Sequence, residues 1–347
     1  MKAHERYFGG FRLRETSGSL AELPKSRADV SIFVVNWETR SKDLLASGQL
    51  TGENCILVRF SDWPGDDAYL THLADLAKAR FEHVEFVSLA SPLNFDALMS
   101  DSEDLARKIC KRGPLSCAVD YTSMPKAMVQ TLFRQFMIEG LCPIVTWFYL
   151  PGLYDETPVR LEEFHQGASQ FFAIRGAEGS GGMSTRRVGI VALGADKPLT
   201  DAFLRAHNYD ETYFVCATSD KSPELSKKMD AHKKWLMIEH GAAESDFINC
   251  GALTVIEALN AFDKIVSSAP ADQGCSVDLF CSGPKSHGIA ASALITNHEH
   301  VRLVARQPTS YARFDVKSLG DVSVTAISDF TNPSMGRALT REYARAP

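Results

Sequence analysis

Short apolar runs alternate with longer amphipathic segments along most of this chain, and this alternation constrains the fold more than any other feature. Before residue 175 the apolar runs are VSIFVVNW, CILVRF, HVEFVSL, SCAVDYTS and PIVTWFYL. After residue 187 the alternation resumes with RVGIVAL, TYFVCAT, SVDLFCS and HVRLVAR. Strands that alternate with helices form parallel sheets with helices on both faces. The pattern therefore predicts an α/β protein with mainly parallel sheets.

The amphipathic segments predict where the helices and the domain boundary lie. We expect helices at 65–80, 95–112, 125–139, 198–207, 222–239 and 252–268. The stretch RGAEGSGGMSTRR is dense in Gly and Ser, as linkers are, and 347 residues suffice for two domains of ordinary size. We therefore predict two three-layer Rossmann-like domains, at 1–174 and 188–347, joined by a linker at 175–187.

The two halves contain related strand-to-helix turns. SCAVDYTSMPKAMVQTLF at 116–133 aligns without gaps on CSVDLFCSGPKSHGIAAS at 275–292. The alignment pairs Ser123 with Ser282 and Lys126 with Lys285. These matches indicate a diverged tandem repeat.

The similarity extends to both sides of these turns. Downstream, each half has an apolar run followed by Pro-x-x-Tyr, ending at Tyr154 in the first half and at Tyr311 in the second. Upstream, ILVRFSD resembles GIVALGAD, which pairs Asp62 with Asp196. We expect all of these residues near the carboxyl ends of strands.

The repeated turn has the composition of an anion site. Ligands of open parallel sheets bind outside the carboxyl ends of the strands, where Ser-x-Pro-Lys offers a hydroxyl, helix-start amides and an ammonium group. Tyrosines at the same edge can stack on a base or bind a ribose. The predicted ligand-binding residues are Ser123, Lys126, Ser282, Gly283, Lys285, Tyr154 and Tyr311. The simpler alternative is that Ser282 only caps a helix and that the tyrosines only pack across strand ends.

The second turn resembles a known family signature. In CRISPR-associated Rossmann-fold (CARF-like) sensor domains, a strand ends in a small polar residue, followed by Gly, one residue and the Lys that opens a helix. CSGPKSHGIA matches with Ser282, Gly283 and Lys285, and YTSMPKAM is a looser copy with Met124 in place of the glycine. Because that family binds cyclic oligonucleotides between two copies, the resemblance implies a sensor in prokaryotic antiviral defence with an effector protein as partner.

Other classes of protein receive little support from the sequence. The formal net charge of -6 gives no general affinity for nucleic acid. Neither G-x-G-x-x-G nor G-x-x-x-x-G-K-[ST] occurs, so we expect no cofactor. The eight cysteines form no C-x-x-C pair, and His298 and His300 alone are poor evidence for a metal, so we expect buried reduced thiols and no metal site.

The first residues and the apolar runs favour a cytoplasmic protein. MKAHERYFGGFRLRE has scattered charges and no apolar core like that of a secretory signal. The longest apolar runs fall short of the roughly 20 residues that span a bilayer, so we expect no membrane partner.

Three functions remain open. The first is a sensor or regulatory protein that binds a phosphorylated small molecule, a nucleotide or oligonucleotide signal, through both turns. The second is an enzyme that cleaves a nucleotide in the same pocket, with His287, Asp62 and Asp196 as proton handlers. The third is a non-catalytic scaffold of a multiprotein assembly. Apolar strands in both halves also leave room for a homo-oligomer.

Overall fold

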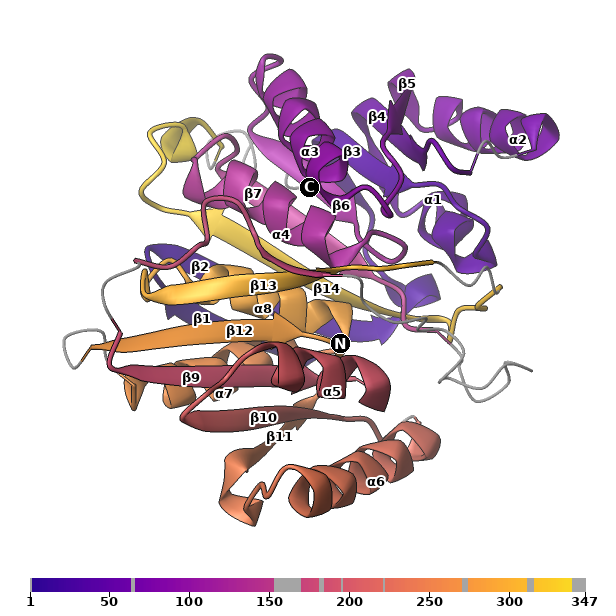
Figure 1. Ribbon diagram of the computed structural model, residues 1–347. Coiled ribbons are helices and arrows are strands. Elements are labelled where there is room, and N and C mark those ends of the chain that lie inside the picture. The colour runs from indigo at the N-terminus through magenta and orange to yellow at the C-terminus, as the bar shows by residue number, and fades with distance from the viewer. Residues whose placement is uncertain are drawn as a thin grey trace. The chain divides into compact units, whose positions relative to one another are not determined.

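The chain folds into two compact units. The computed structural model describes residues 2–63, 66–152, 170–180, 184–194, 196–220, 222–269, 274–310 and 315–338. Unit 1 comprises Met1–Tyr154 and Arg313–Pro347, and unit 2 comprises Asp155–Ala312. Each unit is an α/β domain with a mainly parallel sheet, as the alternation of strands and helices predicts (Figure 1).

Unit 1 contains an eight-stranded sheet in the order β1-β2-β14-β7-β6-β3-β4-β5. Its parallel strands are β3 (Ser26–Val34), β4 (Leu50–Phe60), β5 (Phe81–Leu89), β6 (Ser116–Asp120) and β7 (Ile144–Tyr149). Its antiparallel strands are β1 (Lys2–Phe8), β2 (Phe11–Ser19) and β14 (Asp321–Asp329). The central strand β3 is buried from Ala28 to Val34, because parallel strands are covered on both faces.

Helices cover both faces of this sheet and make unit 1 a three-layer domain (Figure 1). They are α1 (Asp43–Ser47), α2 (Asp67–Lys78), α3 (Phe95–Cys110) and α4 (Lys126–Phe133), which a π-helical turn at Arg134–Ile138 continues. On one face, Leu44 of α1 and Leu70 of α2 share an apolar cluster with Phe33 of β3. On the other face, Phe133 of α4 stacks on Trp147 of β7, with 6.1 Å between ring centroids.

Unit 2 repeats this architecture with a six-stranded sheet in the order β11-β10-β9-β12-β13-β8. The strands are β8 (Gln170–Ala173), β9 (Arg186–Leu193), β10 (Glu211–Thr218), β11 (Phe247–Gly251), β12 (Cys275–Cys281) and β13 (Val301–Gln307). The helices are α5 (Lys197–Ala206), α6 (Pro223–Glu239), α7 (Val255–Ser267) and α8 (Lys285–Leu294). Phe203 of α5 and Leu236 of α6 pack on one side of the sheet with Phe280 of β12.

The strand order shows that the two units are copies of one topology. The five parallel strands are β5-β4-β3-β6-β7 in unit 1 and β11-β10-β9-β12-β13 in unit 2. When the parallel strands of each unit are numbered in chain order, both sheets therefore have the order 3-2-1-4-5. Lys126 and Lys285 are the first residues of the matching helices α4 and α8, as the gapless alignment of the two turns requires. The tandem repeat is thus confirmed.

In each sheet, the antiparallel strand beside the fifth parallel strand comes from the other repeat. β8 follows β7 in the chain but pairs antiparallel with β13, and β14 follows β13 but pairs antiparallel with β7. The predicted domain at 188–347 therefore differs from unit 2, because β14 completes the sheet of unit 1. The chain changes units directly after Tyr154 and one residue after Tyr311. The predicted ligand-binding residues Tyr154 and Tyr311 both lie outside the described residues.

The Gly- and Ser-rich stretch does not join the two units. Its first residues, 175–180, lie along β13 in unit 2, where the Leu303 amide donates to the Ala177 carbonyl at 2.9 Å. The Ser180 amide donates to the Glu299 carbonyl at 2.8 Å. Gly176 and Gly179 have positive φ angles of 74° and 75°, so the glycines here form turns within one domain. The predicted linker at 175–187 is therefore wrong.

Candidate functional site

The predicted turns lie where the strand order of each sheet reverses. The reversal falls between β3 and β6 in unit 1 and between β9 and β12 in unit 2. Open α/β sheets bind ligands at this switch point, outside the carboxyl ends of the strands. Ser123 and Lys126 follow β6, and Ser282 and Lys285 follow β12, so all four lie at the expected edge. Their contact with a ligand stays a prediction.

Both helices at the switch points begin without a side-chain cap. The N-cap residues are Pro125 and Pro284, with φ of −57° and extended ψ angles of 139° and 153°. Proline has no hydroxyl or carboxylate, so the first amides of α4 and α8 receive no side-chain acceptor from it. Lys126 and Lys285 follow at once and are half-buried. The expectation that Ser282 caps α8 is therefore wrong.

In unit 2 the Ser282 hydroxyl joins two neighbouring strand ends. It donates to the Ala192 carbonyl at 3.0 Å and accepts from the Gly194 amide at 3.0 Å. The amides of Ser282 and Gly283 also donate to the Ala192 carbonyl, at 3.0 and 2.8 Å. Ser282 is only 5% exposed. Its hydroxyl thus holds the end of β12 against the end of β9.

Two glycines permit this close approach. A Cβ atom on Gly194 would lie 2.6 Å from the Ser282 carbonyl oxygen, and one on Gly283 would lie 2.4 Å from the Leu193 carbonyl oxygen. Real Cβ atoms do not come so near to backbone atoms. The geometry therefore accounts for Gly283, predicted as a ligand-binding residue, by backbone packing alone.

In unit 1 the matching serine has no such role. Ser123 is 8% exposed, and its hydroxyl finds no hydrogen-bond partner among the described residues. Within the sheets, Phe33 lies opposite Asp120 and Ile190 lies opposite Leu279, the residue that the alignment pairs with Asp120. Phe33 and Ile190 therefore occupy the same position in the two repeats. Trp37 and Gly194 each lie four residues further on, so Trp37 stands at the position of Gly194.

Larger residues thus replace both glycines in unit 1. Trp37 stands at the position of Gly194, and Met124 stands at the position of Gly283. Both side chains carry a Cβ atom, so the close approach seen in unit 2 is sterically closed to unit 1. This difference explains why the Ser123 hydroxyl does not bridge two strand ends.

The polar residues beside the first turn are mostly held by one another. Arg40 is 2% exposed and donates to Glu38 at 2.6 Å and to the Leu150 carbonyl at 3.1 Å. Asn36 accepts from the Glu38 amide at 2.9 Å. Asp120 is 2% exposed, and its Oδ1 accepts from the Thr122 amide at 3.0 Å. The bonds of Asn36 and Arg40 fix the loop after β3, and the bond of Asp120 fixes the end of β6.

The three proposed proton handlers have structural contacts. Asp62 accepts from the Ser91 hydroxyl at 2.8 Å. Asp196 is 1% exposed and is the N-cap of α5, where it accepts from the Leu199 amide at 3.0 Å. His287 is fully buried, with Nε2 3.4 Å from the Cys250 sulfur. These partners, together with the burial of Asp196 and His287, favour roles in folding over proton transfer to a ligand.

The predicted pairing of Asp62 with Asp196 is wrong. Asp62 follows β4, the second parallel strand of its unit, whereas Asp196 follows β9, the first. The strand that matches β9 is β3. The two aspartates therefore occupy different positions in the repeat.

Sequence reasoning missed one residue behind the second switch point. His232 of α6 is fully buried, and its Nδ1 lies 2.9 Å from the Gly194 carbonyl. Burial lowers the pKa of this imidazole to about 4. A neutral His232 thus supports the loop after β9. The basic run DAHKKW that contains it gives no signal for this position.

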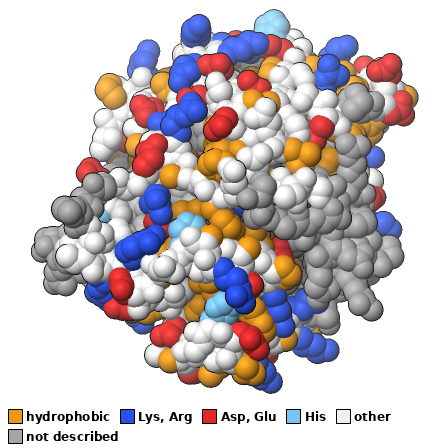
Figure 2. Space-filling model, in the orientation of Figure 1, with side chains coloured by type: hydrophobic (Ala, Val, Ile, Leu, Met, Phe, Trp, Pro, Cys, Tyr) orange, Lys and Arg blue, Asp and Glu red, His pale blue; other side chains and the backbone are white. Residues whose placement is uncertain are grey.

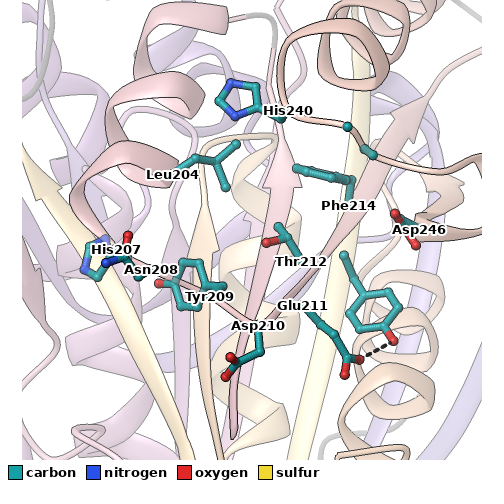
Figure 3. Close-up of a pocket in the computed structure, with 13 residues that line it drawn as sticks. Leu204, His207, Asn208, Tyr209, Asp210, Glu211, Thr212, Phe214, His240 and Asp246 are labelled. Atoms are coloured by element: carbon teal, nitrogen blue, oxygen red, sulfur yellow. Dashed lines mark hydrogen bonds between the residues drawn. The ribbon is translucent and has the colours of Figure 1, made fainter.

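A separate cavity lies at the opposite edge of the sheet of unit 2, where β10 begins (Figure 3). Its volume is about 460 Å³, and its lining includes His207, Glu211, Tyr213 and His240. Tyr213 donates to Glu211 at 3.0 Å. Arg186 also donates to Glu211, which lowers the pKa of that carboxyl. None of the predicted site residues lines this cavity.

The structure gives no support to a metal site or a membrane span in the described ranges. There, the His, Cys, Asp and Glu side chains form no group of three that could hold a metal ion. No helix in these ranges is long and apolar enough to cross a membrane. All eight cysteines are free, and all but the half-buried Cys110 are buried, as the sequence predicts.

Comparisons with known proteins leave the family open. No protein-family model matches the chain, and no curated protein matches it. Among solved structures, the chain is similar to a putative universal stress protein from Pseudomonas aeruginosa UCBPP-PA14, with 10% identity, a TM-score of 0.27 and coverage of 83% of this chain and 95% of that one. It is also similar to a universal stress protein from Archaeoglobus fulgidus DSM 4304, with 10% identity, a TM-score of 0.22 and coverage of 80% and 96%. At such TM-scores the likeness carries no argument about function.

Proposed function

We propose that this protein binds a phosphorylated small molecule, a nucleotide or oligonucleotide signal, at the switch points of its two sheets. One observation carries the proposal. In both units the helix at the switch point begins with a lysine directly after a proline N-cap, and neither helix has a side-chain cap. If Pro-Lys only started a helix, it would not need to occur at the matching point of both repeats.

The chemistry of these turns suits a phosphate. The first amides of a helix are donors that need acceptors, and they carry the positive end of the helix dipole. A cation at this end is unfavourable by itself, and a bound anion offsets it. Figure 2 shows lysine and arginine side chains interspersed with acidic ones over the viewed face. Binding of an anion therefore depends on a local arrangement of donors.

Binding would make the protein a sensor or regulatory module. The resemblance of CSGPKSHGIA to CRISPR-associated sensor domains supports an oligonucleotide ligand, a role in antiviral defence and an effector partner as the finer form of this proposal. The buried positions of Asp196 and His287 favour binding over cleavage.

Calorimetric titration with a panel of nucleotides and cyclic oligonucleotides tests the proposal. Lys126→Ala and Lys285→Ala should each weaken binding by roughly 1.5–3 kcal/mol, the value of a hydrogen bond to a charged group. Lys78→Ala and Lys264→Ala are matched controls, because these lysines are exposed in the last turns of α2 and α7. The controls should bind as the parent protein does.

Two results would refute the proposal. One is the absence of binding by any member of the panel. The other is unchanged affinity in both Lys126→Ala and Lys285→Ala. Product analysis after incubation with the same panel separates binding from cleavage, since an enzyme would convert its ligand.

A further inference from the structure

We infer that the two turns have unequal roles: the Ser123 hydroxyl of unit 1 binds a phosphate oxygen of the ligand, whereas the Ser282 hydroxyl of unit 2 only joins two strands. The inference rests on the proposed function and assigns its contacts. Unit 1 then provides a hydroxyl, helix-start amides and the Lys126 ammonium group. Unit 2 provides only the amides and Lys285, so unit 1 holds the tighter site.

The hydrogen bonds of the two serines carry this inference. The Ser282 hydroxyl already uses its donor and one acceptor position within the protein, on Ala192 and Gly194. The Ser123 hydroxyl is as buried but finds no partner among the described residues. A buried polar group without a partner costs roughly 1–3 kcal/mol, and native proteins rarely keep one. A ligand oxygen would supply the partner that the protein lacks.

The position of Ser123 suits this role. It lies three residues before Lys126 and two before the N-cap Pro125, so its hydroxyl belongs to the turn that leads into α4. α4 has eight residues and presents uncapped amides at this end. Asp120, the last residue of β6, is buried three residues before Ser123, and a bound phosphate therefore needs the positive charge of Lys126.

The sequence difference between the repeats has a direct physical effect on these serines. Gly194 and Gly283 let two backbone segments approach closely in unit 2. At this distance the Ser282 hydroxyl forms its hydrogen bond with the Gly194 amide. Trp37 and Met124 prevent that approach in unit 1. The copy with the poorer match to the family signature is thus the one whose serine hydroxyl has no partner among the described residues.

Two serine variants of the full chain test the inference by two readouts. Affinity is measured for the tightest nucleotide of the panel and for inorganic phosphate, and thermal unfolding is measured without ligand. Ser123→Ala should weaken binding about 10-fold, as the loss of one hydrogen bond to a charged group does, and should leave the unfolding temperature unchanged or higher. Ser282→Ala should lower the unfolding temperature by a few degrees and leave the affinity unchanged.

Opposite results overturn the inference. It fails if Ser123→Ala binds as the parent does, or if Ser282→Ala loses affinity at an unchanged unfolding temperature. Ser282→Cys removes the hydroxyl at a similar side-chain size and replaces Ser282→Ala in the binding test should the alanine variant not fold. If the parent protein still binds the nucleotide, only the inference about the serines fails and the proposed function stands. If the parent binds neither the nucleotides nor phosphate, both fail together.

Discussion

The Gly194 amide donates a hydrogen bond to the Ser282 hydroxyl at 3.0 Å and thereby joins the ends of two neighbouring parallel strands. The bond shows what the repeated turn does in unit 2. It closes the switch point with backbone and hydroxyl contacts and leaves Lys285 at the start of α8. Among the described residues, the matching turn of unit 1 lacks this closure, so the repeated turn takes a different form in each unit.

The first prediction concerns the glycines of that closure. Gly194→Ala and Gly283→Ala should each lower the free energy of unfolding by roughly 1–3 kcal/mol, because the new Cβ atom would overlap a backbone oxygen. Gly288→Ala is the control, since nothing lies within 4 Å of its added Cβ in α8. This change should stabilise the protein by about 0.5–1 kcal/mol through helix propensity. Equal effects of all three substitutions in urea unfolding would contradict the steric account.

Much of the fold is predictable because its central elements have strong local signals. The helices predicted at 95–112 and 222–239 are observed at Phe95–Cys110 and Pro223–Glu239. Strands β1 and β14 escaped prediction because half-exposed antiparallel strands such as KAHERYF and DVSVTAISD contain no continuous apolar run. The exchange of β8 and β14 between the sheets also has no local signature, since it depends on which distant strand edge is free to pair.

The candidate site was predictable in place but not in detail. Lys126 and Lys285 lie at the switch points because each opens the helix that follows β6 or β12, the strands beside the reversal. The role of Gly283 depends on Gly194, which lies 89 residues earlier and meets it only in the folded sheet. Contacts of this kind cannot be read from a local pattern.

The second prediction concerns Asp196, which the sequence suggests as a proton handler. As the N-cap of α5 it should contribute roughly 0.5–2 kcal/mol to stability, so Asp196→Ala should lower the unfolding midpoint. Asp196→Asn should restore most of the loss, because asparagine caps helices as well as aspartate does. Asp220→Ala, at an exposed position, is the control and should change stability by less than about 0.5 kcal/mol. Parent-like stability of Asp196→Ala, with a loss of stability in Asp196→Asn, would exclude the capping role.

The third prediction is a loss of stability in mild acid that depends on His232. Burial lowers the pKa of this imidazole from 6.5 to about 4 in the folded chain. Between these pH values the unfolded state binds more protons, so stability is full above pH 6.5 and decreases as the pH falls toward 4. The whole effect is on the order of 3 kcal/mol. In His232→Gln this part of the slope should disappear from urea unfolding measured at several pH values. His72→Gln is the control, because His72 is exposed on α2 and should leave the slope unchanged.

The fourth prediction follows from the exchanged strands. Ile327 of β14 is fully buried and lies between Val145 of β7 and Leu13 of β2 in unit 1. Ile327→Ala should cost roughly 2–5 kcal/mol as a buried large-to-small change. Hydrogen exchange should then quicken in β7 and β2 while β13, which precedes β14 in the chain, keeps its protection. Ile289→Ala in α8 is the matched control, since this fully buried residue belongs to unit 2 and should affect β12 and β13 instead. Faster exchange in β13 upon Ile327→Ala, with β7 unchanged, would mean that β14 belongs to the sheet of its own repeat.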